Sequence, residues 1–193
     1  MLNRGLLPAE QKREILRDTG ARCGLRTFVE TGTADGSTVA ALVEHFDRLV
    51  SIELDPAHYM NDICRFLHEP KVTIVYGDSD PVLARLAPLL PHPALWWMDA
   101  HYNGEARGAE ETPIRSELAH IFYSRPPGDV VLIDDARMFG AHREYPTMKW
   151  IENFVADHTP GYGWTVRDDI IWLLPSWHHD QGDIRLDWPP EAR

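Results

Sequence analysis

The feature that most constrains the fold of this chain is an alternation of short apolar segments with longer segments of helical periodicity. The apolar segments are TFVET (27–31), RLVSIEL (48–54), KVTIVYG (71–77), ALWWMD (94–99) and VVLIDD (130–135). The helical periodicity covers residues 36–46, 56–68, 80–90, about 112–124 and 147–158. Strands that are apolar on both faces and alternate with helices form a parallel sheet covered by helices on each side. The pattern therefore predicts an α/β fold.

The end of the chain breaks this alternation. Residues 163–176, GWTVRDDIIWLLPS, contain two β-like runs separated only by a polar turn around 167–169. No crossover helix fits between them, so they must form an antiparallel hairpin. We therefore expect a Rossmann-like, seven-stranded, mostly parallel sheet with helices on both faces and a C-terminal antiparallel hairpin. A single domain is expected over 1–193, with a helical extension over 1–26, the core over 27–176 and a tail over 177–193.

Composition narrows the classes of partner. The formal net charge is −11, from 30 acidic and 19 basic side chains. Nucleic acids and anionic membranes bind surfaces of positive potential, so this balance argues against both as the main partner. No apolar run has the length of a membrane span, and Cys23 and Cys64 show neither metal-ligand spacing nor a disulfide framework. We expect a cytoplasmic protein that acts on a small molecule; its oligomeric state stays open, with a homo-oligomer as one alternative.

The first apolar segment runs into a loop with the sequence ETGTADGS, which begins at Glu30. Ligands of open α/β sheets bind outside the carboxyl ends of the strands. Gly32 and Gly36 allow sharp turns and a close approach of the backbone to a ligand, and the next helix offers free N–H groups. Glu53 ends the second strand, where a carboxylate can accept both hydroxyls of a ribose. A dinucleotide and S-adenosylmethionine both suit this arrangement.

The glycine spacing distinguishes between these two ligands. A dinucleotide site requires G-x-G-x-x-G, whereas here only Gly32 and Gly36 are glycine, with Ala34 and Val39 at the other positions. Glu30 also suits an amino group and a sulfonium better than a pyrophosphate. The loop therefore favours S-adenosylmethionine, and a plain glycine-containing turn that starts a helix is the alternative.

A second acidic cluster follows the fourth and fifth apolar segments, at Asp99 and at Asp134 with Asp135. Adjacent parallel strands bring these ends close together, at the same edge as the loop. Three convergent carboxylates repel one another unless a cation or protons compensate. Oxygen ligands with open positions suit a hard divalent ion such as Mg²⁺ or Mn²⁺. In the structural alternative, Asp134 caps the next segment and Asp135 is solvated. Arg137, just after this pair, either balances local negative charge or contacts an anionic substrate.

These motifs resemble those of a known family. ETGTADG, SIELD and GDS (77–79) are similar to the successive ligand-binding motifs of class I S-adenosylmethionine-dependent methyltransferases, and the resemblance covers residues 27–176. One departure is Ala34, which stands at the family's middle glycine. The resemblance implies that the cofactor is bound by Gly32 and Gly36 at its methionine part, Glu53 at its ribose, and Asp78 and Ser79 near its adenine, with Glu30 and Thr33 completing the set.

The acidic cluster resembles that of the metal-dependent O-methyltransferases, both the catechol type and the macrocin type that acts on sugars. Those families have an aspartate after the fourth strand and an acidic or amide pair after the fifth, and Asp99, Asp134 and Asp135 match these positions. In the macrocin type, an acidic residue two positions after the first aspartate is the proposed general base. His101 stands there in this chain. Imidazole titrates near neutrality, so we predict His101 as the base, with ligand orientation as its alternative role.

We therefore predict an S-adenosylmethionine-dependent, Mg²⁺-assisted O-methyltransferase that acts on a hydroxyl of a small molecule, either a sugar or other polyol or a phenolic diol. One alternative is a metal-independent class I methyltransferase that acts on nitrogen or a carboxylate. The other is a cofactor-binding protein without catalysis. Substrate choice falls to the loop at 102–115 and the N-terminal helix, where no motif indicates the acceptor.

Overall fold

The computed structural model describes residues 7–99 and 112–176, and these contain one seven-stranded sheet. The strands are β1 (Thr27–Thr31), β2 (Arg48–Glu53), β3 (Val72–Tyr76), β4 (Ala94–Met98), β5 (Val130–Ile133), β6 (Tyr162–Arg167) and β7 (Ile170–Pro175). Their spatial order is β3-β2-β1-β4-β5-β7-β6. The first five strands are parallel, and β7 runs antiparallel to both of its neighbours. The predicted sheet and its terminal hairpin are confirmed.

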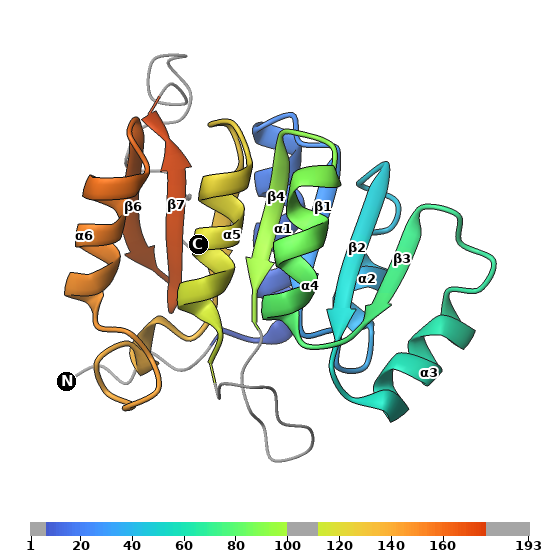
Figure 1. Cartoon of the computed structure of the whole chain (residues 1–193). Helices are drawn as coiled ribbons and strands as arrows, with labels where there is room; N and C mark the ends of the chain where they lie inside the picture. The colour runs from blue at the N-terminus through green and yellow to red at the C-terminus, as the bar shows by residue number, and fades with distance from the viewer. Residues whose placement is uncertain (1–6, 100–111, 177–193) are drawn as a thin grey trace.

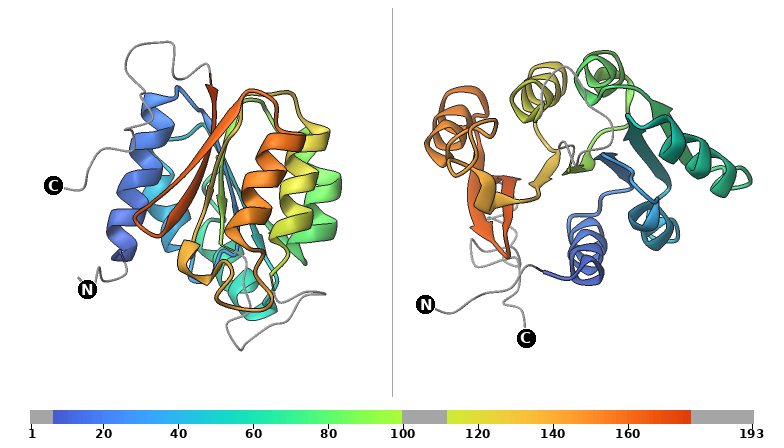
Figure 2. Two further views of the ribbon diagram at one scale, coloured as in Figure 1. Left: turned by 90° about the vertical axis from the view of Figure 1, so that its left-hand side faces the viewer. Right: turned by 90° about the horizontal axis from the view of Figure 1, so that it is seen from below.

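Helices cover both faces of the sheet (Figures 1 and 2). They are α1 (Ala9–Arg22), α2 (Ser37–Leu42), α3 (Pro56–Arg65), α4 (Ser79–Leu86), α5 (Ile114–Ser124) and α6 (Met148–His158), with 3-10 turns η1 (Ala87–Leu89) and η2 (Ala136–Met138). α1 and α2 pack on one face, α4, α5 and α6 pack on the other, and α3 lies beside β3. Three helices end earlier than their periodicity predicts. α3 stops at Arg65. α2 stops at Leu42, and α4 gives way to η1, where Pro88 lacks the amide hydrogen of a regular helix.

The sheet separates two hydrophobic clusters. Successive strand residues point to opposite faces, so Trp96 packs in the cluster with α4, α5 and α6, and Trp97 packs in the cluster with α1 and α2. Both tryptophans are buried, as expected from their apolar segment. Within the described part of the chain, no helix has the length and apolarity needed to cross a membrane.

Backbone hydrogen bonds continue past the carboxyl ends of the parallel strands, and we call this side of the sheet the carboxyl edge. The amide of Gly32 donates to β2 at 2.9 Å, the amide of Asp99 donates to β1 at 3.2 Å, and the amide of Asp134 donates to β4 at 3.1 Å. The amide of Gly77 likewise donates to the carbonyl of Glu53 at 2.9 Å. The residues that follow four different strands are therefore fixed at one edge by the sheet itself. Figure 2, right, shows the molecule from this side.

The terminal hairpin closes through Asp168 and Asp169, which have positive φ angles of 55° and 63°. Two such residues in succession form a type I′ turn, whose twist suits a two-residue hairpin loop. The carbonyl of Asp169 accepts the amide of Ala136 at 2.8 Å. This hydrogen bond ties the hairpin turn to the segment after β5.

The opposite, amino edge of the sheet contains a buried ion pair between Arg125 and Asp129. Arg125 also donates to three carbonyls in and after η1, at 2.6, 3.0 and 2.9 Å. Asp129 accepts the amide that opens β4, at 2.7 Å. The guanidinium lies 5.2 Å from the centre of the Trp96 ring. The pair connects α5, η1, β4 and β5 at the base of the sheet.

Candidate active site

The loop between β1 and α2 has an unusual backbone. Gly32, Ala34 and Gly36 all have positive φ angles, of 89°, 53° and 66°. A side chain at Gly36 would place its Cβ 2.4 Å from an oxygen of the buried Asp62, so only glycine fits there. Ala34 adopts the left-handed conformation despite its Cβ, which costs about 1 kcal/mol relative to glycine. The middle position of the motif therefore keeps the conformation that a glycine would favour.

Glu53 connects this loop to the end of β2 through hydrogen bonds. Its Oε2 accepts the amide of Ala34 at 2.8 Å, and its Oε1 accepts the amide of Asp55 at 2.7 Å. A carboxylate offers about four lone-pair directions, so acceptor capacity remains on Glu53 after these two bonds. The carboxylate is thus preorganised by the protein backbone and able to accept further donors.

Glu30 lies beneath the loop and is buried. The hydroxyl of Ser51 donates to its Oε1 at 2.7 Å, and the hydroxyls of Ser51 and Thr33 share a second hydrogen bond. Burial raises the pKa of Glu30 to about 8, although the bond from Ser51 opposes this shift. A cationic group bound next to Glu30 would favour its ionised form.

The predicted adenine-side residues lie at the end of the neighbouring strand, β3. Asp78 caps α4 and accepts the amide of Asp80 at 3.3 Å. Ser79 is buried at the first position of α4. The structure therefore brings the end of β3 to the same edge as the loop and Glu53.

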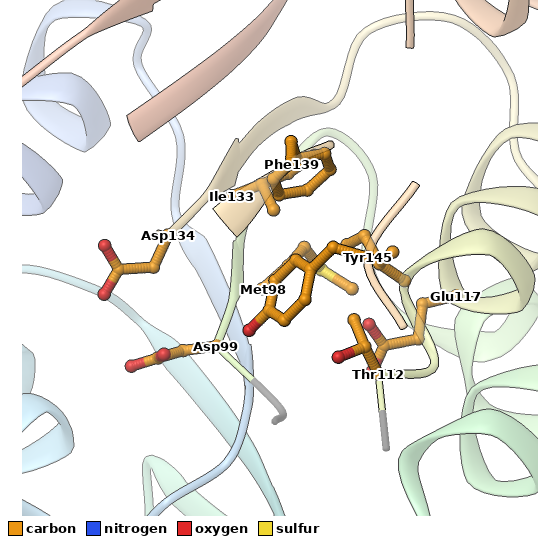
Figure 3. A pocket seen from close by; sticks show the side chains of 9 residues that line it. Met98, Asp99, Thr112, Glu117, Ile133, Asp134, Phe139 and Tyr145 are labelled. Atoms are coloured by element: carbon orange, nitrogen blue, oxygen red, sulfur yellow. The ribbon is translucent and has the colours of Figure 1, made fainter. Parts of the chain in front are cut away.

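Asp99 and Asp134 project from the ends of the adjacent strands β4 and β5 (Figure 3). Asp134 is buried, and burial together with the charge of Asp99 raises its pKa to about 6. Its Oδ2 accepts a hydrogen bond from the ammonium of Lys12 on α1, and its Oδ1 accepts the amide of Asp135 at 2.8 Å. Sequence reasoning missed Lys12, because the pair joins residues far apart in the chain.

Asp135 differs from these two aspartates. Its backbone is left-handed, with φ 58°, and its Oδ1 accepts a hydrogen bond from Arg137 at 2.7 Å. Arg137 also pairs with Asp169 in the hairpin turn. The interpretation of Arg137 as a balance for local negative charge fits these contacts. Across residues 7–99 and 112–176, no group of three or more His, Cys, Asp or Glu side chains has the arrangement of a metal site.

A pocket opens at the ends of β4 and β5, and it contains a second residue that sequence reasoning missed (Figure 3). Its lining residues are Met98, Asp99, Thr112, Ile114, Glu117, Ile133, Asp134, Phe139 and Tyr145. Glu117 is fully buried in α5, on the same face as Ile114, Leu118 and Ile121. A glutamate at a core position of an amphipathic helix was the signal that could have identified it.

Three predicted features lie outside the described residues: His101, the loop through residue 111, and the tail from residue 177. Because His101 is not among the described residues, its role as the base stays a prediction. The described part of the site comprises the β1–α2 loop, Glu53 and the β3 end on one side, and the pocket at β4 and β5 on the other.

Solved methyltransferase structures share this fold. TomG, an O-methyltransferase from Streptomyces achromogenes in complex with SAM, matches with a TM-score of 0.63 and 18% identity, over 90% of this chain and 83% of that chain. An O-methyltransferase from Bacillus cereus in complex with SAH matches with a TM-score of 0.63 and 17% identity, over 88% and 82%. The SAH-bound Podospora anserina methyltransferase PaMTH1 matches with a TM-score of 0.62 and 13% identity, over 88% and 80%.

No protein-family model and no curated protein sequence matches the chain. The structural matches define the fold: the chain folds like these methyltransferase structures.

Proposed function

We propose that this protein transfers the methyl group of S-adenosylmethionine to a hydroxyl oxygen of a small molecule. The observation that carries the proposal is the pairing of two sites at one edge of the sheet. A strained loop held by Glu53 lies at the ends of β1 and β2, and a polar pocket lies at the ends of β4 and β5. The first has the chemistry of a cofactor site, and we assign the second to the methyl acceptor.

The residues of the first site fit S-adenosylmethionine. The spare acceptor capacity of Glu53 suits the two ribose hydroxyls, and the buried Glu30 suits the positively charged methionine part. Gly36 allows the tight turn of this loop, because a side chain there would collide with Asp62. We assign Gly32, Thr33, Asp78 and Ser79 to the same site.

When bound, the cofactor supplies a methyl group already activated on a positively charged sulfur. In the transfer, the acceptor oxygen would form a bond to this methyl carbon as the carbon–sulfur bond broke, with its electron pair left on sulfur. The hydroxyl proton passes to a base, for which we propose His101. Asp99 and Tyr145 line the pocket where the hydroxyl would be held, and positioning of this kind supplies much of the rate enhancement.

The predicted Mg²⁺ or Mn²⁺ ion at Asp99, Asp134 and Asp135 stays a prediction, and the described contacts do not fit it. Asp134 accepts a hydrogen bond from Lys12, and Asp135 accepts one from Arg137. A divalent ion at Asp134 would have to displace Lys12 or lie beside its positive charge. We therefore assign no step of the reaction to a metal ion.

The finer features of the proposal rest on the sequence. We propose a sugar, another polyol or a phenolic diol as the acceptor, with no nucleic acid or membrane as partner. Methyl transfer to nitrogen or a carboxylate is the competing activity. Two free cysteines, Cys23 and Cys64, suit the reducing cytoplasm that we propose as the location.

Incubation with methyl-labelled S-adenosylmethionine and a panel of polyols, phenolic diols and amines tests this proposal. We expect label in an ether linkage to an acceptor oxygen, together with the demethylated cofactor. Asp99→Asn should lower turnover with little effect on cofactor binding. Label recovered only on nitrogen or a carboxylate would overturn the assignment to oxygen. If label reached none of the acceptor classes, the proposed enzymatic activity would be contradicted.

A further inference from the structure

Lys12 is held at the carboxyl edge by the packing of its helix, α1. Leu16, one helical turn further along, is buried in the cluster that contains Leu95 and Trp97. Residues four positions apart lie on the same face of a helix, so Lys12 also faces the sheet. Its side chain is only 20% exposed, and lysine is rarely buried without a charged partner. The packing of α1 therefore fixes where this positive charge lies.

Two aspartates at this edge point to the side on which α1 packs. Met98 and Ile133 belong to the cluster beneath α4, α5 and α6, so the residue after each turns to the opposite face. Figure 3 shows the side chains of Asp99 and Asp134 extending to the same side of their strands. The ammonium of Lys12 donates to Oδ2 of Asp134, and Oδ1 accepts the next backbone amide at 2.8 Å. Both oxygens of Asp134 thus have a donor from the protein itself.

The cations of the chain match the charge that a divalent ion would bring. Lys12 pairs with Asp134, and Arg137 pairs with Asp135 while it also contacts the hairpin turn. Together these two side chains carry two positive charges, as one Mg²⁺ ion does. Asp134 lies within the electrostatic influence of Asp99, so the charge of Lys12 compensates a repulsion between carboxylates. A divalent ion at Asp134 would add positive charge beside the ammonium, and like charges repel.

We propose that Lys12 takes the place of a divalent ion in this site, and that methyl transfer to the acceptor oxygen needs no metal. This inference rests on the proposed function and deepens it by naming a further catalytic residue. An ammonium group has three N–H donors, and among the described residues Asp134 accepts one of them. Because Asp134 lines the pocket assigned to the acceptor, a second N–H would hold the acceptor oxygen there.

The charge of Lys12 would act on the acceptor oxygen as its proton leaves. A fixed positive group stabilises the negative charge that develops on such an oxygen, and it requires no reorganisation of solvent. The transfer balances without a metal ion. The hydroxyl oxygen would bond to the methyl carbon, the carbon–sulfur electron pair would stay on sulfur, and the proton would pass to the proposed base, His101.

Turnover of the best acceptor from the labelled-cofactor panel, measured with EDTA and with added Mg²⁺, tests the proposal. We expect the two wild-type rates to agree within about twofold. Lys12→Met keeps the length of the side chain without its charge and should lower turnover at least about hundredfold, with unchanged affinity for S-adenosylmethionine. Lys12→Arg keeps the charge and should restore part of this loss. A loss with EDTA that Mg²⁺ restores, or a wild-type rate in Lys12→Met, would overturn the proposal.

Lys149→Met is the matched control. It removes the same charge from the exposed side of α6, where Lys149 pairs with Glu152. Its turnover should equal that of the wild type in both conditions. A loss of turnover as large as that of Lys12→Met would overturn the assignment to Lys12.

A binding measurement separates this proposal from the proposed function. 4-Nitrophenol has a single hydroxyl, so it cannot chelate a metal ion, and its ionised form absorbs visible light. Its ionisation on the protein is followed by absorbance across pH, with S-adenosylhomocysteine and EDTA present. Lys12→Met should raise the pH of this ionisation by about one unit relative to the wild type, a tenfold loss of preference for the ion. Lys12→Arg and Lys149→Met should not.

The outcomes of this measurement are distinct. Equal ionisation in the wild type and Lys12→Met, or no binding of 4-nitrophenol at millimolar concentration, would overturn the role of Lys12. Absence of S-adenosylmethionine binding to the wild type would instead contradict the proposed function.

Discussion

The buried ionisable groups at the two edges of the sheet differ in how many hydrogen-bond partners they have. At the amino edge, Arg125 and Asp129 form a pair in which each charged group is surrounded by hydrogen-bond partners. At the carboxyl edge, Glu30 and Glu117 are fully buried with fewer partners, and burial raises the pKa of each to about 8. The same fold therefore contains one saturated and one unsaturated set of buried ionisable groups.

This difference separates structural from functional burial. A saturated ion pair fixes how α5, η1 and two strands meet, and nothing further can bind to it. Unsaturated carboxyl groups lower the stability of the empty protein but keep acceptor capacity for a ligand. The proposed cofactor and acceptor sites both lie at the unsaturated edge.

The largest expected effect is at the amino edge. Asp129→Asn leaves the buried guanidinium of Arg125 without its counter-charge, and we expect a loss of about 3–5 kcal/mol in the free energy of unfolding. Urea denaturation followed by circular dichroism measures this loss. The exposed pair Arg26–Asp47 provides the control, since Asp47→Asn should leave stability unchanged. Equal effects of the two substitutions would remove the distinction between saturated and solvent-exposed pairs.

The carboxyl edge should give the protein an unusual pH dependence. Glu30 and Glu117 ionise near pH 4.5 when unfolded but near 8 when folded, so between these values the folded state holds more protons. Stability is therefore greatest below pH 4.5 for these groups and falls as pH rises toward 8, by up to about 1.4 kcal/mol per pH unit for each group. Urea denaturation across this window measures the slope. Glu117→Gln should reduce it, and a slope unaffected by this variant would contradict the assignment.

Replacement of Glu117 by an apolar residue of similar length should stabilise the protein. Glu117→Met removes a buried, unsatisfied carboxyl group, and we expect a gain of about 1–2 kcal/mol in the free energy of unfolding. Thermal unfolding detects the gain. A destabilised variant would show that Glu117 has a structural role.

Lys12 offers a test of the metal prediction. Because Lys12 and a divalent ion would compete for Asp134, Lys12→Met should tighten Mn²⁺ binding about tenfold. Electron paramagnetic resonance of added Mn²⁺ measures this affinity, and Asp134→Asn in the same background should abolish the gain. Identical affinities of Lys12→Met and the wild type would show that Lys12 does not compete.

The smallest effect is expected in the cofactor loop. Ala34 has a left-handed backbone, so Ala34→Gly should stabilise the protein by up to about 1 kcal/mol. Thermal unfolding measures the change. Gly24→Ala, at another exposed positive φ with open space around it, should destabilise by a similar amount and so calibrates the measurement. A destabilised Ala34→Gly variant would contradict the strain assigned to this loop.

The sheet could be predicted because its signals are local. Apolar runs, helical periodicity and the polar turn before β7 each depend on neighbouring residues, and they predicted the five parallel strands and the hairpin. Glu53 and the loop glycines were found in the same way, because they lie directly after strands.

The side-chain pairing at the carboxyl edge could not be predicted in the same way. The Lys12–Asp134 pair depends on how α1 docks against the carboxyl edge, and the direction of Asp135 depends on a left-handed backbone at that residue. Neither property has a local sequence signal. Glu117 could have been identified from the sequence, since it occupies a core position of a predicted helix.

Calorimetric titration with S-adenosylmethionine, and separately with NAD, tests the central claim most directly. The account predicts one S-adenosylmethionine site per chain, weakened at least about tenfold in Glu53→Gln through loss of carboxylate hydrogen bonds, and no NAD binding. Binding of NAD without binding of S-adenosylmethionine would contradict it.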